Sequence, residues 1–153
     1  MISNASMITL ICFLLSIGVE GCTGARPGNL GVKDGRLAPC PSSLNCVSSQ
    51  SLDREHAIEP LAYTVAAPTA HDDMKKIILG MKRAEIITDT GAYIHAEFAS
   101  SIWRFVDDVE FYFDDNAKVI HVRSASRLGK SDFGVNRKRV ESIRSLWKRT
   151  EKR

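Results

Sequence analysis

The sequence predicts an α+β domain: an antiparallel sheet of about four or five strands with two helices packed on one face, in the order β-α-β-β-β-α. Two patterns lead to this prediction. In several short segments apolar residues occupy every second position, as in strands with one buried face. In two longer segments apolar residues lie three and four positions apart, as in helices with one apolar stripe. With 153 residues, the chain has room for one core of ordinary size.

The first strand and helix are expected between residues 62 and 81. Residues 62–67 form a short strand candidate, and Pro68-Thr69 opens the helix. Thr69 is the expected N-cap because Asp72 follows three residues later, as in a capping box. The helix would bury one apolar stripe, made of Met74, Ile77, Ile78 and Met81.

Three alternating strands should follow Ile86-Ile87 and a turn at residues 89–91, at residues 93–99, 108–113 and 118–125. The side chains expected on their buried face are Ile94, Ala96, Phe98, Val109, Phe111, Phe113, Ile120 and Val122. A last helix is expected at about residues 134–148, with Ser131 or Asp132 as its cap. Its apolar stripe is Val140, Ile143, Leu146 and Trp147.

The N-terminus resembles an export signal. Residues 8–19 are almost wholly apolar, but a helix of that length spans only ~18 Å against ~30 Å of hydrocarbon. A signal peptide over residues 1–21 is therefore favoured over a transmembrane helix. The following Val-Glu-Gly-Cys resembles the bacterial lipoprotein cleavage box, which makes Cys22 the candidate lipidation site, although Glu20 is unusual there. An ordinary cleaved signal and an uncleaved anchor are the alternatives.

Export would place the protein on the periplasmic face of the cell envelope, and the remaining cysteines agree with an oxidising compartment. Residues 22–36 are expected to be a flexible, glycine-rich tether, and residues 37–153 a single globular domain. Cys40 and Cys46 enclose a short loop rich in Pro, Ser and Asn and predict a disulfide worth about 2 kcal/mol. Reduced thiols or redox activity are the alternatives.

One constellation of polar residues surrounds the start of the last helix. Its members are Arg123, Arg127, Asp132, Asn136 and Arg137. Free N–H groups at a helix N-terminus favour an anion, and Arg binds phosphate or carboxylate through a bidentate fork. These residues therefore form a candidate anion pocket. Alternatively, Asp132 and Asn136 cap the helix, and an Arg pairs with Asp132.

A second constellation is the polar face of the sheet. Its members are His95, Glu97, Asp108, Glu110 and His121. Neighbouring strands could bring acid–base pairs together there, and a His between carboxylates can bind metal. The alternative is a solvated face of mixed charge. Because the chain has no H-E-x-x-H, G-x-S-x-G or Walker-type motif, an enzyme is not favoured, and we predict no metal and no cofactor.

Basic residues are frequent along the last helix and after it. In a cytosolic protein they would suggest nucleic acid, but export argues against this partner. Anionic lipid or cell-wall polymer would suit such a helix, and so would plain solvation. The net charge is only +3, so the chain as a whole exerts no strong field.

Three motifs resemble the domain of unknown function 1499 family. The first is Leu-Ala-Pro-Cys-Pro-Ser-Ser-Leu-Asn-Cys-Val-Ser-Ser at 37–49, where Leu44 stands at a position at which Pro is common. The second is Phe-Val-Asp-Asp-Val-Glu-Phe at 105–111, and the third is the Arg- and Gly-containing signature at 123–139. The resemblance covers about residues 37–147. It implies a small secreted or membrane-attached domain and carries no activity, cofactor or catalytic residue.

Together these features favour an uncharacterised envelope lipoprotein, held to the membrane by a lipid anchor, whose non-enzymatic domain binds an anionic ligand or an envelope protein. One rival is a hydrolase-like envelope enzyme that uses the polar sheet face or the Arg/Asp/Asn junction. The other is a structural or assembly factor. An open pocket would favour the first two, and a closed, fully paired surface the third.

Overall fold

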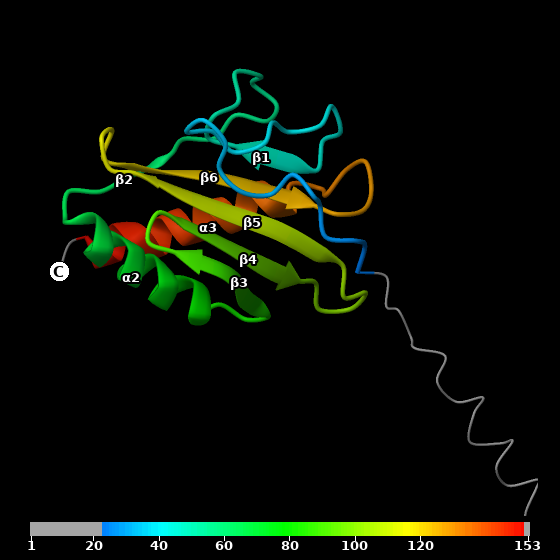
Figure 1. Ribbon diagram of the computed structural model, residues 1–153. Helices are drawn as coiled ribbons and strands as arrows, with labels where there is room; N and C mark the ends of the chain where they lie inside the picture. Colours follow the sequence, from blue (N-terminus) through cyan, green and yellow to red (C-terminus); the bar gives the residue numbers. More distant parts are fainter. Residues whose placement is uncertain (1–22, 152–153) are drawn as a thin grey trace, which may run out of the picture.

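The computed structural model describes residues 23–151, so the expected signal peptide and Cys22 lie outside the described residues. Within this range the chain folds as one antiparallel sheet and two helices (Figure 1). The elements are β1 (Cys46–Ser48), β2 (Leu61–Ala62), α2 (Ala67–Leu79), β3 (Ala84–Thr90), β4 (Tyr93–Ala99), β5 (Val106–Asp114), β6 (Val119–Ser126) and α3 (Val135–Thr150). The strand order is β1-β6-β5-β4-β3, and β2 also pairs with β6.

The α+β class and the order of the main elements are confirmed. The three residues of β1 are too few to show an alternating pattern, and this strand was not predicted. The strand expected at residues 62–67 is shorter and begins earlier, because β2 comprises only Leu61–Ala62. The predicted N-cap Thr69 is wrong, because α2 begins at Ala67. Pro68 then lies in the first turn, where its missing N–H leaves no helical hydrogen bond unmade.

The hydrophobic core lies between the helices and one face of the sheet. α2 contacts α3 and β3, whereas α3 contacts β6 and β1. Most of the fully buried apolar side chains are those predicted from the two periodicities, among them Met74, Ile78, Ile94, Val109, Phe111, Ile120, Val122, Val140 and Ile143. Leu61 and Ala70 are fully buried without having been predicted, whereas Ile77, Met81 and Leu146 of the predicted helix stripes are only half-buried. Neither helix of the described part is long and apolar enough to cross a bilayer.

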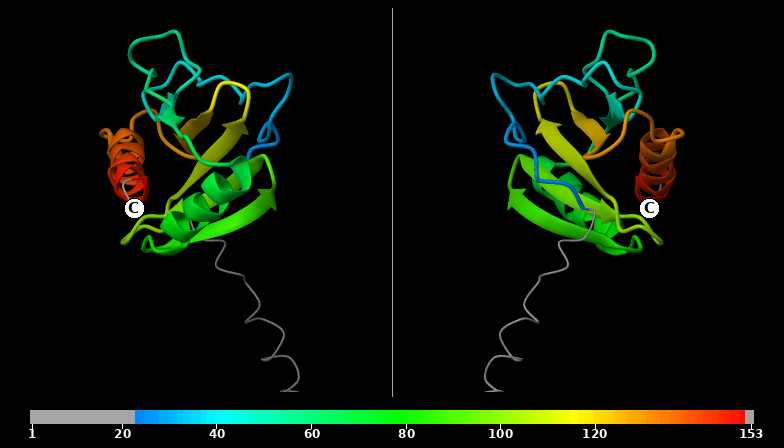
Figure 2. Two further views of the ribbon diagram at one scale, coloured as in Figure 1. Left: turned by 90° about the vertical axis from the view of Figure 1, so that its left-hand side faces the viewer. Right: turned by 90° about the vertical axis from the view of Figure 1, so that its right-hand side faces the viewer.

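The opposite face of the sheet is covered by residues 23–36. Figure 2 shows α3 on one side of the sheet and this segment, in blue, on the other. We expected a flexible tether, but the segment hydrogen-bonds to the sheet, for example from the Gly31 N–H to Glu110. Its glycines let the main chain approach closely: a Cβ on Gly24 would lie 2.9 Å from Cβ of Arg127. The predicted disulfide between Cys40 and Cys46 is confirmed beside it.

Candidate functional site

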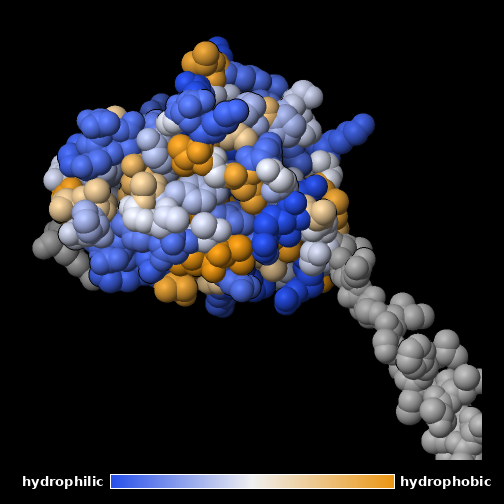
Figure 3. All heavy atoms as spheres, viewed as in Figure 1, coloured by the Kyte–Doolittle hydropathy of each residue, from blue (hydrophilic) through white to orange (hydrophobic). Residues whose placement is uncertain are grey.

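Ionisable side chains from β4, β5 and β6 gather on the covered face of the sheet. The antiparallel register places His95 opposite Glu110 and Glu97 opposite Asp108, so four of the five predicted residues of the polar face meet. Strand alternation points them away from the core. They are not solvated: Asp108 is 1% exposed, and His95, Glu110 and Arg123 are buried as well. From outside, this side of the molecule is mainly hydrophilic, with hydrophobic residues in small groups (Figure 3).

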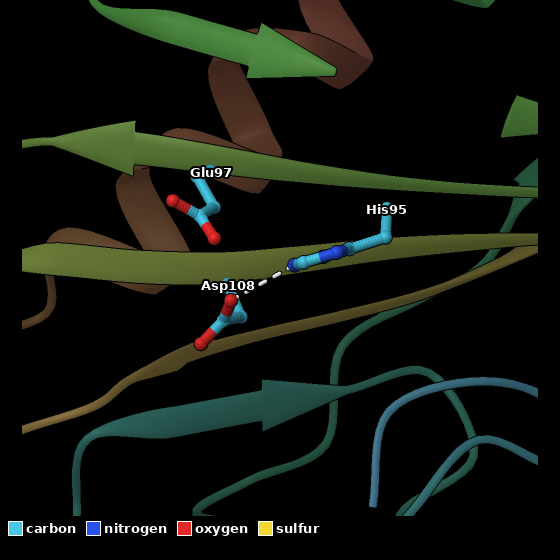
Figure 4. A group of neighbouring side chains, drawn as sticks. All are labelled: His95, Glu97 and Asp108. Carbon is cyan, nitrogen blue, oxygen red and sulfur yellow. Dashed lines mark hydrogen bonds and ion pairs between the residues drawn. The ribbon is translucent and has the colours of Figure 1, made fainter. Parts of the chain in front are cut away.

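Arg127 holds Asp108 through two hydrogen bonds. Its Nε donates to Oδ2 and its Nη2 to Oδ1, each over 2.8 Å. Oδ1 also accepts a hydrogen bond from Nε2 of His95 at 2.8 Å, the contact drawn in Figure 4. The same Nη2 of Arg127 reaches Oε1 of Glu97. Arg127 therefore joins the end of β6 to β4 and β5 through a bidentate pair, which is the strongest geometry for a guanidinium and a carboxylate.

Glu110 is fully satisfied at the centre of the face. Its Oε2 accepts a hydrogen bond from Nη1 of Arg123 at 3.0 Å. Its Oε1 accepts from the hydroxyl of Tyr93 at 2.9 Å and from the N–H of Gly31 at 2.8 Å. Nε of Arg123 is buried without a hydrogen-bond partner among residues 23–151. The guanidinium is still ion-paired with Glu110 through Nη1, so its charge has a partner.

The pKa values follow from these contacts. Burial alone would raise the pKa of the Asp108 carboxyl, but hydrogen bonds from Arg127 and His95 outweigh it and hold the pKa below its usual range. The pKa of Glu97 is lowered against its own burial by Arg127 and Arg26. The hydrogen bond to Asp108 raises the pKa of Arg127, and burial raises that of Tyr93. Both carboxylates are thus ionised at neutral pH.

Residues 23–36 complete the network as well as cover it. Arg26 Nε lies 2.7 Å from Oε1 of Glu97, and the Gly24 carbonyl accepts a longer hydrogen bond, 3.5 Å, from Nη1 of Arg127. The face then holds three carboxylates, from Glu97, Asp108 and Glu110. It also holds three guanidinium groups, from Arg26, Arg123 and Arg127. The charges of these six groups balance, so the face is a closed ionic network.

The closed network bears on metal binding. One ligand atom each from His95, Glu97 and Asp108 lies within 4.8 Å of the others, a spacing that could hold a metal ion. However, Arg127 donates to both carboxylates of this triad. A divalent ion would have to displace the guanidinium and leave it buried beside the metal's positive charge. The cation bound by this triad is therefore the guanidinium group of Arg127.

The five residues of the predicted anion pocket are divided by the sheet. Arg123 and Arg127 lie on the covered face with the carboxylates, whereas Asp132, Asn136 and Arg137 lie near the start of α3. Asp132 accepts hydrogen bonds from the N–H groups of Gly134 and Asn136, so its carboxylate already caps the helix. Arg137 donates to the backbone carbonyls of residues 57 and 55 at 2.8 and 2.9 Å. A hollow of about 350 Å³ is lined by Asp132 and Arg137, where an anion would meet a carboxylate already in place.

A second buried polar cluster, which was not predicted as a unit, holds α3 against the sheet. Asn136 is completely buried: its Oδ1 accepts from Ser124 Oγ at 2.6 Å, and its Nδ2 donates to the Asn45 carbonyl at 3.0 Å. Arg139 donates to Oδ1 of Asn136 and reaches Asp107 at 2.5 Å. Asp107 occupies a helix-facing position of β5 that the apolar alternation would give to a hydrophobic residue. That break in the pattern was the available signal.

A hydroxyl and an imidazole meet at the edge of the sheet. Ser49 Oγ lies 3.3 Å from Nδ1 of His121 and also accepts the N–H of Val122 at 2.9 Å. Burial lowers the pKa of His121 and favours the neutral ring, and of the two nearby charges Asp114 opposes this effect while Arg36 adds to it. His121 is therefore not part of the ionic network that the other four residues of the predicted polar face form. The pair could not be predicted from the sequence, because Ser49 and His121 are 72 positions apart.

A groove of about 1070 Å³ lies between residues 28–42 and residues 48–56. Its apolar lining includes Leu30, Val32, Leu37, Pro39 and Leu52. His56 also lines it, but Nδ1 of this ring is bonded to the Cys46 carbonyl at 2.9 Å. None of the predicted site residues in the described chain lines this groove except Cys40.

Comparison with known proteins agrees with the resemblance seen in the sequence. The model of a family described as protein of unknown function (DUF1499) matches residues 36–146. No curated protein matches the chain.

Replacing Arg127 by Ala should destabilise the fold strongly. The change leaves the buried carboxylate of Asp108 without its bidentate partner, which costs about 3–5 kcal/mol for a buried pair. Urea unfolding measures the loss. Arg26→Ala is the matched control, because it removes a half-exposed guanidinium from the same network and should cost about 0–1 kcal/mol. Equal, small losses for the two variants would show that the network contributes little to stability.

The free energy of unfolding should fall in acid. Folding lowers the pKa values of Asp108 and Glu97, so their stabilisation is complete above the unfolded values of about 4 and is lost as the pH falls through the folded values. Urea titrations from about pH 7 to about pH 3 measure this. The pKa values of Asp89 and Asp115 are lowered as well, so these residues also contribute to the loss of stability in acid. The variant Asp108→Asn isolates the contribution of Asp108, and its free energy of unfolding should fall less steeply with falling pH. Identical pH profiles for this variant and the parent chain would contradict the assignment.

Proposed function

Because the chain belongs to the DUF1499 family, for which no activity is defined, we propose from its own residues that it is a lipid-anchored, non-enzymatic envelope protein whose domain binds a protein partner. The observation that carries this proposal is the groove between residues 28–42 and 48–56, the open pocket that a binding protein needs. The ionic network on the sheet offers no such pocket, because its carboxylates and guanidinium groups neutralise one another beneath residues 23–36. Neither an anion nor a substrate finds an unpaired charged group there.

The proposal of a lipid anchor is supported by sequence and by position. Residues 8–19 are apolar and end just before Cys22, as in a lipoprotein signal. The folded part of the chain includes Gly24, whose carbonyl accepts a hydrogen bond from Arg127. The domain therefore begins immediately after the candidate lipidation site. This arrangement suits a protein that works at the membrane surface of the periplasmic side.

Partner binding is supported by the groove between residues 28–42 and 48–56. A groove of about 1070 Å³ with an apolar lining suits the side chains of a protein segment. Its charged residues have both signs, including Lys33 and Arg36 as well as Asp34 and Asp53. A small anion would need an excess of unpaired cations, so a protein segment is the better match for this surface.

Photo-crosslinking in living cells tests the partner. A photoreactive residue at position 52, which is 98% exposed beside the groove, should give one discrete adduct in the membrane fraction. The matched control is position 116, which is exposed in the turn between β5 and β6, outside the groove. No adduct at position 52, or equal adducts at both positions, would contradict binding at the groove.

Cys22→Ala tests the anchor separately, since it should release the protein from the membrane fraction.

The enzyme alternative has one observation in its favour, the contact of Ser49 with His121. A nucleophile within 3.3 Å of a neutral imidazole is the arrangement of a serine hydrolase. However, no carboxylate of residues 23–151 hydrogen-bonds to the other ring nitrogen, so nothing described orients the base as a catalytic triad requires. The hydroxyl is also engaged by the N–H of Val122. The pair is better explained as a link between the chain after β1 and β6.

A fluorophosphonate probe distinguishes the two interpretations of Ser49. These probes phosphonylate activated serines with loss of fluoride, so we expect no adduct on the full-length protein at neutral pH, as for a serine that is not activated. Detection is by intact-mass spectrometry, with Ser49→Ala as the control. An adduct on the parent chain that disappears in Ser49→Ala would replace the binding proposal with a hydrolase.

A further inference from the structure

The loop between β4 and β5 carries an unusual set of exposed hydrophobic side chains. Ile102, Trp103 and Phe105 are consecutive apart from Arg104, and Trp103 is 71% exposed. The chain has two tryptophans, and Trp147 is 2% exposed in the core. Isolated exposed apolar residues are ordinary on a soluble surface, but three in one short loop indicate a surface that contacts something apolar.

Further apolar residues lie at the same end of the sheet. Ala99 pairs with Val106, and Asp107 pairs with Ser126, so the loop after β6 emerges beside the loop between β4 and β5. Figure 1 shows both loops at the end where the described chain begins. The loop after β6 adds exposed Leu128 and Phe133, the latter 90% exposed. We call these two loops, residues 100–105 and 127–134, the basal loops.

The exposed charges of the basal loops are mainly positive. Arg104 and Lys130 are exposed, and Arg83 is tied to the same end by a hydrogen bond from its Nε to the Ala99 carbonyl at 3.0 Å. The one acidic residue in these loops, Asp132, accepts the N–H groups that begin α3. Apolar and aromatic side chains beside Lys and Arg are the composition of surfaces that enter the interface of an anionic bilayer.

The start of the described chain places the basal loops next to the expected anchor. A Cβ on Gly24 would lie 3.1 Å from Cγ of Leu128, so Gly24 touches a basal loop. Cys22, the candidate lipidation site, precedes Gly24 by two residues, and two residues span at most about 7 Å. An acyl chain on Cys22 would therefore hold the basal loops at the headgroup region and leave no length for the domain to stand away from the membrane.

We propose that the basal loops form a membrane-docking surface that inserts Trp103 and its apolar neighbours into the interface of an anionic phospholipid bilayer. The inference rests on the lipid anchor of the proposed function and adds the orientation of the domain. In this orientation the end of the sheet that carries the loop between β4 and β5 faces the membrane. Arg104 and Lys130 contact lipid phosphates, while Ile102, Trp103 and Phe105 lie at the level of the headgroups.

Tryptophan fluorescence of the full-length protein tests the docking surface. The protein is reconstituted into vesicles of phosphatidylglycerol and phosphatidylethanolamine, and Trp103 is quenched by acrylamide from water or by brominated lipid from the bilayer. We expect brominated lipid to quench Trp103 and acrylamide quenching to fall about threefold relative to an exposed reporter. The Trp103→Phe variant leaves Trp147 as the one tryptophan and so measures the background fluorescence of this buried residue. An unchanged Trp147 emission spectrum shows that the fold is intact.

The matched reporter is a chain with Trp103→Phe and Leu52→Trp, because position 52 is exposed but lies outside the basal loops. This tryptophan should stay open to acrylamide and untouched by brominated lipid. Equal acrylamide quenching at positions 103 and 52 on vesicle-bound protein would overturn the proposal. So would a Trp103 shielded from acrylamide but not quenched by brominated lipid, since a protein partner or a second copy would then cover it.

Charge and anchoring are separated by two further measurements. Arg104→Gln combined with Lys130→Gln should raise acrylamide quenching of Trp103 on anionic vesicles, and the parent chain should be less protected on phosphatidylcholine vesicles. Equal protection on both lipids would contradict the choice of an anionic bilayer.

Flotation with the vesicles tests the anchor by itself. Protein that does not float contradicts the proposed function, whereas floating protein with an exposed Trp103 contradicts only the docking surface.

Discussion

The bidentate pair between Arg127 and Asp108 is the interaction on which the arrangement of the covered face depends. Asp108 belongs to a central strand and is 1% exposed, so its charge cannot be left without a partner. Arg127 follows the end of β6 and supplies that partner, and its guanidinium also reaches Glu97 on the next strand. One side chain thereby ties three neighbouring strands together. It also fixes the path of the chain as it leaves the sheet for α3.

The same pair explains why residues 23–36 are packed on the sheet. Arg127 would be open to water on its outer side, and the main chain at Gly24 closes that side because glycine has no Cβ to collide with it. Arg26 then neutralises Glu97, and the Gly31 N–H reaches Glu110. Each step removes another charge from solvent and gives it a partner. A stretch whose composition indicates a linker is therefore a structural layer, and its order comes from buried charges on strands far away in the sequence.

The fold could be predicted to the extent that its residues alternate with a clear period. The strands β4, β5 and β6 and the helix α3 follow their apolar patterns, whereas β1 is too short to have one. Four residues of the polar network were predicted, but not its burial, because period-2 alternation tells which side chains share a face but not what covers them. The anion pocket grouped Arg127 with Asn136 by proximity in sequence. The sheet separates them, since Arg127 turns back to Asp108 while Asn136 packs against Ser124.

If the chain is anchored at Cys22 as proposed, the covered face and the basal loops together determine how the domain is presented to the membrane. A linker of fourteen free residues would let a domain sample many orientations, but the segment after Gly24 is hydrogen-bonded to the sheet at Arg26 and Gly31. The length between Cys22 and the fold is thus about two residues, or about 7 Å. In the proposed docking, which holds the β4–β5 end at the lipid, the groove between residues 28–42 and 48–56 would take a definite height and direction above the bilayer. A partner that binds this groove would then be one that meets it at the membrane surface.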